Sequence, residues 1–268
     1  MTISFWKMHG AGNDFILVDD RALTFPCADA AWIARIASRR TGVGCEGILL
    51  IQPSERVHFR MRFFNPDGGE ADMCGNGARC VARLAHDLGV APSGMRFETQ
   101  AGVLEAEVLG EQVMLTLTPP TDWRLGRTLE LPGGRRAYGF VNSGVPHVVV
   151  EVDDLESMDV AAIGAAIRYH KDFAPKGTNA DFIQVTGPQS LRIRTYERGV
   201  EAETLACGTG MVAAGLVAGR MGRVRPPVRI VCASGDALEV NFRLTAGGAD
   251  QVSLLGPAAY VFTGEVEY

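Results

Sequence analysis

Two cysteines stand out because each is followed by Gly-x-Gly and then by a run of small and apolar residues. The motifs cover residues 74–77 (CGNG) and 207–210 (CGTG). Each run predicts a helix that begins at the cysteine, where backbone N–H groups lack intrahelical partners and the helix dipole adds about half a positive charge. Both effects stabilise a thiolate or a bound carboxylate, and the glycines let a ligand approach the backbone. Each motif is therefore a candidate site for a reactive thiol beside a carboxylate.

The two motifs occupy matching places in the two halves of the chain. A glutamate precedes each cysteine by the same interval, Glu70 before Cys74 and Glu203 before Cys207. Further upstream, FRMRFF alternates like LRIRTY in the second half, and VDD occurs before each of these segments. Several matches in one order and at nearly one spacing indicate a duplicated domain.

Each half predicts short strands before the cysteine helix and more strands after it. We therefore expect an α+β fold with two pseudo-symmetric domains, each a mostly antiparallel sheet wrapped around one central helix. Pro119 and Pro120 fall where a linker is expected. The expected domains are residues 1–119 plus 256–268, carrying Cys74, and residues 120–255, carrying Cys207.

Two such motifs on related domains suit proton transfer at a carbon next to a carboxylate. If the domains close face to face, the two sulfurs flank Cα from opposite sides, so that a thiolate removes the proton and a thiol delivers one. The pair shares one proton, and its two titrations are therefore coupled. Aimed N–H dipoles in a dry cavity stabilise the carbanion, and acid–base help from the thiols adds about 10²–10⁴-fold. This chemistry requires no cofactor, neither pyridoxal phosphate nor a metal ion.

The other cysteines, Cys27, Cys45, Cys80 and Cys232, lack this glycine context, and we interpret them as structural. No pair has the Cys-x-x-Cys spacing of a zinc or redox site. The net charge of −5 argues against nucleic acid or an anionic membrane as the main partner. No leader and no membrane-spanning run is evident, so we expect a cytoplasmic protein with reduced thiols.

The segment 10–14 (GAGND) has some features of a nucleotide-binding loop. It lacks the Gly-x-Gly-x-x-Gly spacing, and no strand precedes it in the required way. We therefore reject that interpretation.

Ordered motifs along essentially the whole chain resemble those of the diaminopimelate epimerase family. They are FWKMHGAGNDF at 5–15, FNPDGGE at 64–70 and MCGNGARC at 73–80, followed by GVPH at 144–147, GTNADF at 177–182, YERG at 196–199 and ACGTG at 206–210. The resemblance implies a diaminopimelate epimerase-like fold with the active site in the interdomain cleft. It also implies a small amino-acid substrate, interconversion of LL- and meso-2,6-diaminopimelate in lysine and peptidoglycan biosynthesis, and a homodimer.

The resemblance further implies a role for individual residues. Cys74 and Cys207 are the acid/base pair, with His147 and Glu197 in support. Backbone N–H groups at four positions hold the reacting carboxylate: Gly75, Asn76, Gly208 and Thr209. Asn13 lies near the reacting amino group, and four residues bind the distal end of the substrate: Asn65, Asn179, Glu197 and Arg198.

Without the resemblance, simpler interpretations of these residues stay open. Glu197 and Arg198 suit a surface ion pair, Asn65 and Asn179 suit turns, and His147 suits a structural histidine.

The chain also departs from the family pattern. Gly47 stands where some members have glutamine, and Val145 where some have asparagine. Three alternatives follow: a sister two-cysteine racemase of proline, hydroxyproline or another amino acid, a phenazine-type isomerase, or a thiol sensor. In the sensor, Cys74 and Cys207 form a reversible disulfide. The phenazine-type enzymes are disfavoured because we expect no cysteine pair in them.

Overall fold

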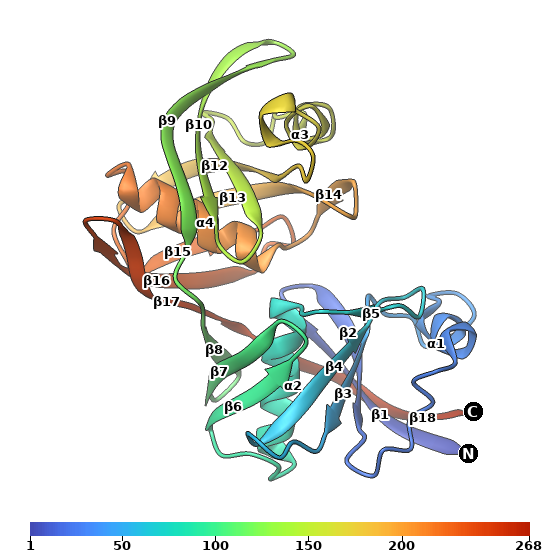
Figure 1. The fold of residues 1–268 in the computed structure, drawn as a ribbon. Coiled ribbons are helices and arrows are strands. Elements are labelled where there is room, and N and C mark those ends of the chain that lie inside the picture. The colour runs from blue at the N-terminus through green and yellow to red at the C-terminus, as the bar shows by residue number, and fades with distance from the viewer. The chain divides into compact units, whose positions relative to one another are not determined.

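The computed structural model describes all 268 residues. The chain divides into two compact units (Figure 1), one comprising Met1–Thr116 and Leu255–Tyr268 and the other Leu117–Leu254. Each unit is described by itself below.

The first unit consists of strands arranged around a central helix, with a shorter helix outside them. Its elements are β1 (Thr2–Gly10), β2 (Asn13–Asp19), α1 (Ala30–Ala37), β3 (Ile48–Gln52), β4 (Phe59–Phe64), β5 (Glu70–Ala71), α2 (Gly75–Asp87), β6 (Gly94–Thr99), β7 (Gly102–Leu109), β8 (Gln112–Thr116) and β18 (Ala259–Glu267). The last strand pairs antiparallel with β1, so the C-terminal segment completes this unit.

The second unit repeats this plan. Its elements are β9 (Thr121–Leu131), β10 (Gly134–Asn142), β11 (Pro146–Glu151), α3 (Val160–Arg168), the 3₁₀ turn η1 (Lys171–Phe173), β12 (Asn179–Gly187), β13 (Ser190–Glu197), β14 (Ala202–Thr204), α4 (Gly208–Arg220), β15 (Val228–Val231), β16 (Ala237–Thr245) and β17 (Gly248–Pro257). The β9–β10 hairpin occupies the place that β18 and β1 hold in the first unit.

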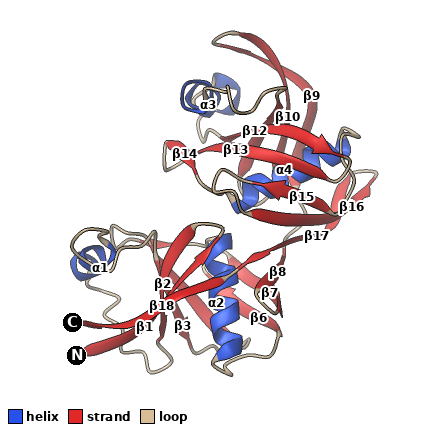
Figure 2. Ribbon diagram, turned by 180° about the vertical axis from the view of Figure 1, so that it is seen from behind, coloured by secondary structure: helices blue, strands red, loops and turns tan.

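Most strand pairs are antiparallel, and the parallel pairs recur at matching places. These are β2–β3 and β4–β6 in the first unit, and β11–β12 and β13–β15 in the second. Figure 2 shows strands of each unit around its long helix, α2 or α4. The residues of α4 from Gly210 to Gly219 are all buried, as a helix enclosed by sheet requires. The expected α+β fold with a central helix in each half is confirmed.

Sheet register makes the duplication visible at single residues. Arg62 on β4 forms a bidentate pair with Glu70 at 2.7–2.8 Å, and Arg194 on β13 does the same with Glu203. These are the glutamates that precede the two cysteines in the sequence. In each unit the ion pair joins the strand before the cysteine to the short strand that leads into the helix.

Two short helices, α1 and α3, were not predicted from the sequence. Each begins at an aspartate whose side chain caps the first turn: Asp29 accepts the N–H of Trp32 at 2.9 Å, and Asp159 accepts that of Ala162 at 3.0 Å. Their buried faces follow helical spacing, with Ile33 and Ile36 in α1 as an example. Helices this short leave only a brief periodic pattern, and that pattern is easily overlooked beside the strands around it.

Candidate functional site

Cys74 is the N-cap residue of α2. Its backbone is extended (φ −138°, ψ 121°), and its carbonyl accepts the N–H of Ala78 at 2.7 Å. The residue is half-buried. Beside it, a Cβ added to Gly75 would meet nothing within 4 Å, so a ligand has room at the first turn of the helix. The thiol and the N–H groups of that turn therefore lie at one end of α2, as the sequence predicted.

The hairpin between β1 and β2 brings Asn13 to this thiol. Ala11 and Gly12 both have positive φ (55° and 82°), as a two-residue hairpin turn of this type requires. Asn13 Oδ1 accepts the Cys74 thiol at 3.6 Å and the Asn76 amide at 3.2 Å. The glycine-rich segment is thus a hairpin turn that places an amide against the cysteine.

Charged groups surround Asn13, and no motif in the sequence predicts them. Asn13 donates its amide to Glu46, while Asp14 accepts Lys7 at 2.5 Å and Arg39 at 2.6 Å. Burial of the Asp14 carboxyl raises its pKa, but the hydrogen bonds and charges of Arg39 and Lys7 outweigh burial and leave the pKa lowered. Asp14 is therefore an anion that anchors the β1–β2 hairpin.

Arg79 is a second residue at this site that the sequence alone does not predict. It lies on α2 and is fully buried. Its guanidinium donates to Asn76 Oδ1 at 2.8 Å and to the carbonyl of Pro257 at 3.3 Å. The guanidinium thus holds the side chain of Asn76, one of the residues expected at the carboxylate.

Cys207 is the N-cap residue of α4 and is only 7% exposed. Its Sγ lies 3.5 Å from Thr209 Oγ1. Burial raises its pKa well above the ordinary thiol value, and the charges of Glu197 and Asp181 raise it further. The sequence predicted a lowered pKa at a helix start; for Cys207 that prediction is wrong, because burial and two nearby carboxylates outweigh the helix N-terminus. Cys207 is therefore a protonated thiol at neutral pH.

His147, Asp181 and Thr209 form a hydrogen-bonded cluster next to Cys207, in which His147 and Asp181 are fully buried and Thr209 is partly buried. His147 is fully buried at the start of β11. Its Nδ1 lies 2.7 Å from Asp181 Oδ2, and its Nε2 lies 3.0 Å from Thr209 Oγ1. The histidine thus reaches Cys207 through one hydroxyl group. Asp181 was not predicted to belong to the site.

The residues expected at the distal end of the substrate lie near the same cluster. Asn179 is buried at the start of β12, and its Oδ1 accepts the backbone N–H of Arg198 at 2.7 Å. The Arg198 guanidinium donates to the carbonyl of Lys176 at 3.4 Å. Glu197 ends β13 and accepts the hydroxyl of Thr204 at 2.9 Å. The second unit therefore brings Asn179 into direct contact with Arg198, whose neighbour Glu197 is close enough to Cys207 for its charge to act on the thiol.

Asn65, the remaining residue expected at the distal end of the substrate, follows β4 in the first unit. Its backbone N–H donates to Gly69 at 2.8 Å, and its carbonyl accepts the N–H of Gly68 at 2.9 Å. The residue thus makes the tight turn between β4 and β5. Of the predicted residues in the first unit, Asn13, Cys74 and Asn76 are in direct contact, and Asn65 has the backbone role that its neighbouring glycines suggest.

The structure explains one departure from the family pattern. A Cβ added to Gly47 would lie 2.3 Å from the ring of Phe63. Phe63 therefore occupies the space that a glutamine side chain would need. Val145 lies in the turn before β11, where its carbonyl accepts the N–H of Ser143 at 3.2 Å.

All six cysteines are free thiols. Burial raises the pKa of Cys80 to about 12, and it also raises the pKa values of Cys45 and Cys27. Thiols of this kind are poor nucleophiles. Cys74 and Cys207 are distinguished from these three by their position at the start of a long helix.

Comparison with known proteins identifies the family. The family model described as diaminopimelate epimerase matches residues 5–121 and 139–260. A diaminopimelate epimerase of Aquifex aeolicus is 40% identical over 98% of both chains, and one of Chlorobaculum tepidum is 43% identical over 97% of this chain and 99% of the other. The chain belongs to the diaminopimelate epimerase family. A relative of the same name from Archaeoglobus fulgidus is 39% identical over 98% of this chain and 96% of its own.

Solved structures extend the likeness in fold. A PhzF-family phenazine biosynthesis protein of Bacillus anthracis covers the whole of both chains with a TM-score of 0.77 at 18% identity. A probable proline racemase of Agrobacterium radiobacter covers 99% of this chain and 93% of its own, with a TM-score of 0.70 at 16% identity. The family therefore shares its two-unit fold with proteins of other names. None of the helices in this chain has the length and apolar character needed to cross a membrane.

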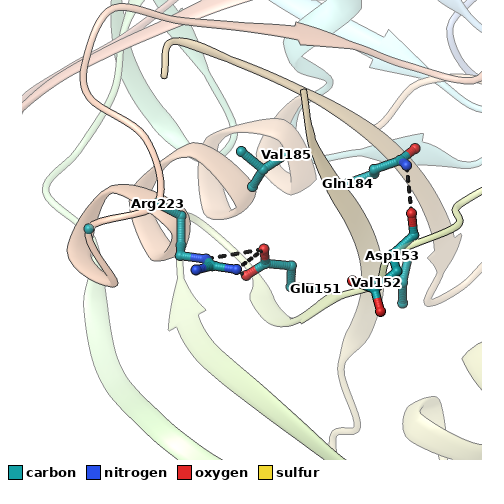
Figure 3. A pocket seen from close by; sticks show the side chains of 7 residues that line it. Glu151, Val152, Asp153, Gln184, Val185 and Arg223 are labelled. Carbon is teal, nitrogen blue, oxygen red and sulfur yellow. Dashed lines mark hydrogen bonds and ion pairs between the residues drawn. The ribbon is translucent and has the colours of Figure 1, made fainter. Parts of the chain in front are cut away.

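A surface hollow in the second unit lies near the C-terminal end of α4 (Figure 3). It is lined by Glu151 at the end of β11, by Arg223 beyond the C-terminus of α4, and by Gln184 on β12. Arg223 forms an ion pair with Glu151 at 2.6 Å, and Gln184 donates to the carbonyl of Asp153 at 2.7 Å. Since Cys207 caps the opposite end of α4, this hollow is separate from the thiol.

Proposed function

We propose that the protein interconverts LL- and meso-2,6-diaminopimelate, an isomerase reaction in lysine and peptidoglycan biosynthesis. The observation that carries this proposal is the relatives named diaminopimelate epimerase, 40–43% identical over nearly the whole chain. The structure adds a cysteine at the start of the central helix in each unit, Cys74 and Cys207.

In the proposed mechanism the two cysteines act as acid and base on opposite faces of the substrate Cα. One sulfur, as thiolate, takes the α-proton, and the other, as thiol, delivers a proton to the carbanion. After one turnover the protonation states are exchanged, so the reverse reaction uses the same pair. The raised pKa of Cys207 favours the thiol form for this residue before substrate binds.

The carbanion needs positive dipoles near the reacting carboxylate. We assign this role to the first-turn N–H groups of α2, at Gly75 and Asn76, and of α4, at Gly208 and Thr209. Such donors act without reorganisation and are worth several kcal/mol, about 2.7–4 kcal/mol for a single oxyanion donor in other enzymes. The open space beside Gly75 supports this assignment. Asn13 would receive the reacting amino group beside Cys74.

A substrate with a second amino-carboxylate end needs an anion, a cation and amides. We assign these to Glu197, Arg198, Asn179 and Asn65, with His147 and Glu197 supporting Cys207. The hydrogen bond that the Arg198 backbone N–H donates to Asn179 Oδ1 holds the backbone of Arg198 in place. A racemase of single amino acids, the alternative, would have no use for this charged group. Both proposals imply a small-molecule substrate.

Turnover in deuterated water tests the proposal. Epimerisation of LL-diaminopimelate should place solvent deuterium at the inverted centre. Cys74→Ser and Cys207→Ser should each abolish inversion, whereas Cys27→Ser, a control at a half-buried thiol outside the motifs, should keep it. Full inversion by either serine variant would refute the cysteine pair. Turnover of free L-amino acids but not of diaminopimelate would favour the sister racemase.

We also propose that the protein is a homodimer. Three large side chains of β18, Tyr260, Val261 and Phe262, are 36–56% exposed, and exposed apolar side chains of this size are often buried in interfaces. We further propose that it works in the cytoplasm, where a catalytic thiol pair stays reduced.

A further inference from the structure

We propose that Asp181 is a positioning residue of this reaction. From beneath the first turn of α4 it fixes the protonated nitrogen of His147 and, through Thr209, the hydrogen bond made by Cys207. Its kinetic consequences rest on the proposed function, because Cys207 is one of the two proposed proton carriers.

Asp181 is fully buried, and both of its oxygens are engaged. Oδ2 lies 2.7 Å from His147 Nδ1, and Oδ1 accepts the hydroxyl of Thr195 at 2.8 Å. A buried carboxylate is costly unless hydrogen bonds compensate it, and these two bonds do so. Their directions leave the carboxylate a single orientation, with one oxygen aimed at the imidazole.

Asn179 determines which nitrogen of His147 carries the proton. Its Oδ1 accepts the backbone N–H of Arg198, so its NH₂ group faces His147 Nε2 at 3.3 Å. A donor in that place requires a lone pair on Nε2. The imidazole is therefore neutral, with its proton on Nδ1 toward Asp181. A carboxylate on one ring nitrogen fixes the other as an acceptor, as it does for metal-binding histidines.

Thr209 then connects His147 to the thiol. The single lone pair of Nε2 is shared by two donors, the Asn179 amide at 3.3 Å and the Thr209 hydroxyl at 3.0 Å. The hydroxyl uses its own lone pair to accept the Cys207 S–H at 3.5 Å. Once Cys207 has given its proton to the carbanion, the hydroxyl rotates and donates to the thiolate, while Nε2 keeps the Asn179 amide. One hydroxyl thus supports both forms of the proton carrier without displacement of a heavy atom.

The first unit provides an internal comparison for Asp181. Asp181 pairs with Val149 on β11 and with Thr195 on β13. In the same place in the first unit, Leu49 pairs with Leu17 on β2 and with Phe63 on β4. The duplicated fold is therefore built with an apolar pair, Leu49 and Phe63, where the second unit has an aspartate and a threonine.

The contacts of α2 and α4 support the equivalence of Leu49 and Asp181. A Cβ added to Gly77, in the first motif, would lie 3.0 Å from Leu49 Cδ1. A Cβ added to Gly210, in the second motif, would lie 2.6 Å from Asp181 Oδ1. Packing under the helix does not require polar groups, and buried polar groups cost free energy. The network under Cys207 is therefore explained by what it does for the thiol.

Two substitutions of Asp181 distinguish its hydrogen bond to His147 from the negative charge of its carboxylate. Asp181→Leu, which copies the first unit, removes the acceptor for Nδ1–H and should lower kcat by about 10- to 100-fold with little change in KM. Asp181→Asn keeps an acceptor and should retain most of kcat. Asp153→Asn, at an exposed aspartate of the same unit, is the matched control and should behave as wild type. Wild-type kcat in a folded Asp181→Leu variant would overturn the proposal.

Two measurements do not depend on turnover. Nitrogen-15 NMR of the imidazole should show the Nδ1–H form of His147 in wild type and Asp181→Asn, and a mixture of forms in Asp181→Leu. The pH midpoint for alkylation of Cys207 by iodoacetamide, followed on its own peptide, should fall in Asp181→Asn because a nearby negative charge is removed. A wild-type spectrum that showed the Nε2–H form of His147 would overturn the proposal even if Asp181→Leu failed to fold. If these results hold but wild type does not turn over diaminopimelate, the proposed function fails, while the positioning of His147 and Cys207 by Asp181 stands.

Discussion

Thr209 Oγ1 lies 3.0 Å from Nε2 of His147, so a hydrogen bond ties the first turn of α4 to the start of β11. The same hydroxyl lies 3.5 Å from the sulfur of Cys207. A substitution at Thr209 therefore alters the proposed proton carrier while leaving the backbone N–H that is assigned to the carboxylate.

Thr209→Val should lower kcat for diaminopimelate about tenfold with little effect on KM, because the thiol and thiolate both lose a hydrogen-bond partner. Thr209→Ser keeps the hydroxyl and should retain most of the activity. Steady-state kinetics in both directions of the reaction provide the measurement. Equal kcat values for the valine and serine variants would show that the hydroxyl has no part in proton transfer.

Gly210→Ala should destabilise the protein and reduce activity. The new Cβ would lie 2.6 Å from Asp181 Oδ1, so either α4 or the carboxylate must shift. Overpacking of this kind costs about 1–3 kcal/mol. Gly94→Ala, at a glycine with nothing within 4 Å, is the control and should not lower the free energy of unfolding in urea. A Gly210→Ala variant as stable and active as wild type would mean that the close approach is not maintained in solution.

The sequence predicted the parts of the site that repeat. Cys74 and Cys207 each carry the same local motif, and the glutamates before them turn out to pair with Arg62 and Arg194. A feature that occurs twice at matching places is recognisable without coordinates. The central helices and most of the strands were predicted for the same reason.

The parts that differ between the two halves were not predicted. Asp181 lies on β12, a strand of mixed polar and apolar residues, and an aspartate is ordinarily expected to face solvent. Only strand register shows that it lies under α4 and beside His147. The raised pKa of Cys207 depends likewise on burial and on carboxylates from other strands. Neither can be inferred from the local motif.

Val261→Glu should weaken the proposed homodimer. Val261 is 56% exposed, between Tyr260 and Phe262 on β18, and a carboxylate there would be desolvated in an apolar interface. Sedimentation velocity should show a smaller species for this variant than for wild type at equal concentration. Leu23→Glu, at a residue 63% exposed outside β18, is the control. A wild-type protein that sediments as a monomer would contradict the proposal directly.

Cys80→Ala should change how stability depends on alkaline pH. Burial raises the Cys80 pKa from 9.0 to about 12, so between these values the unfolded thiol loses its proton while the folded thiol keeps it. The folded state then binds more protons, and the free energy of unfolding falls as pH rises through this window. Urea unfolding of wild type should therefore show a loss from about pH 9 upward that is smaller in Cys80→Ala, with the difference at pH 7 as the baseline. Parallel curves for the two proteins would mean that water reaches the Cys80 thiol in the folded state.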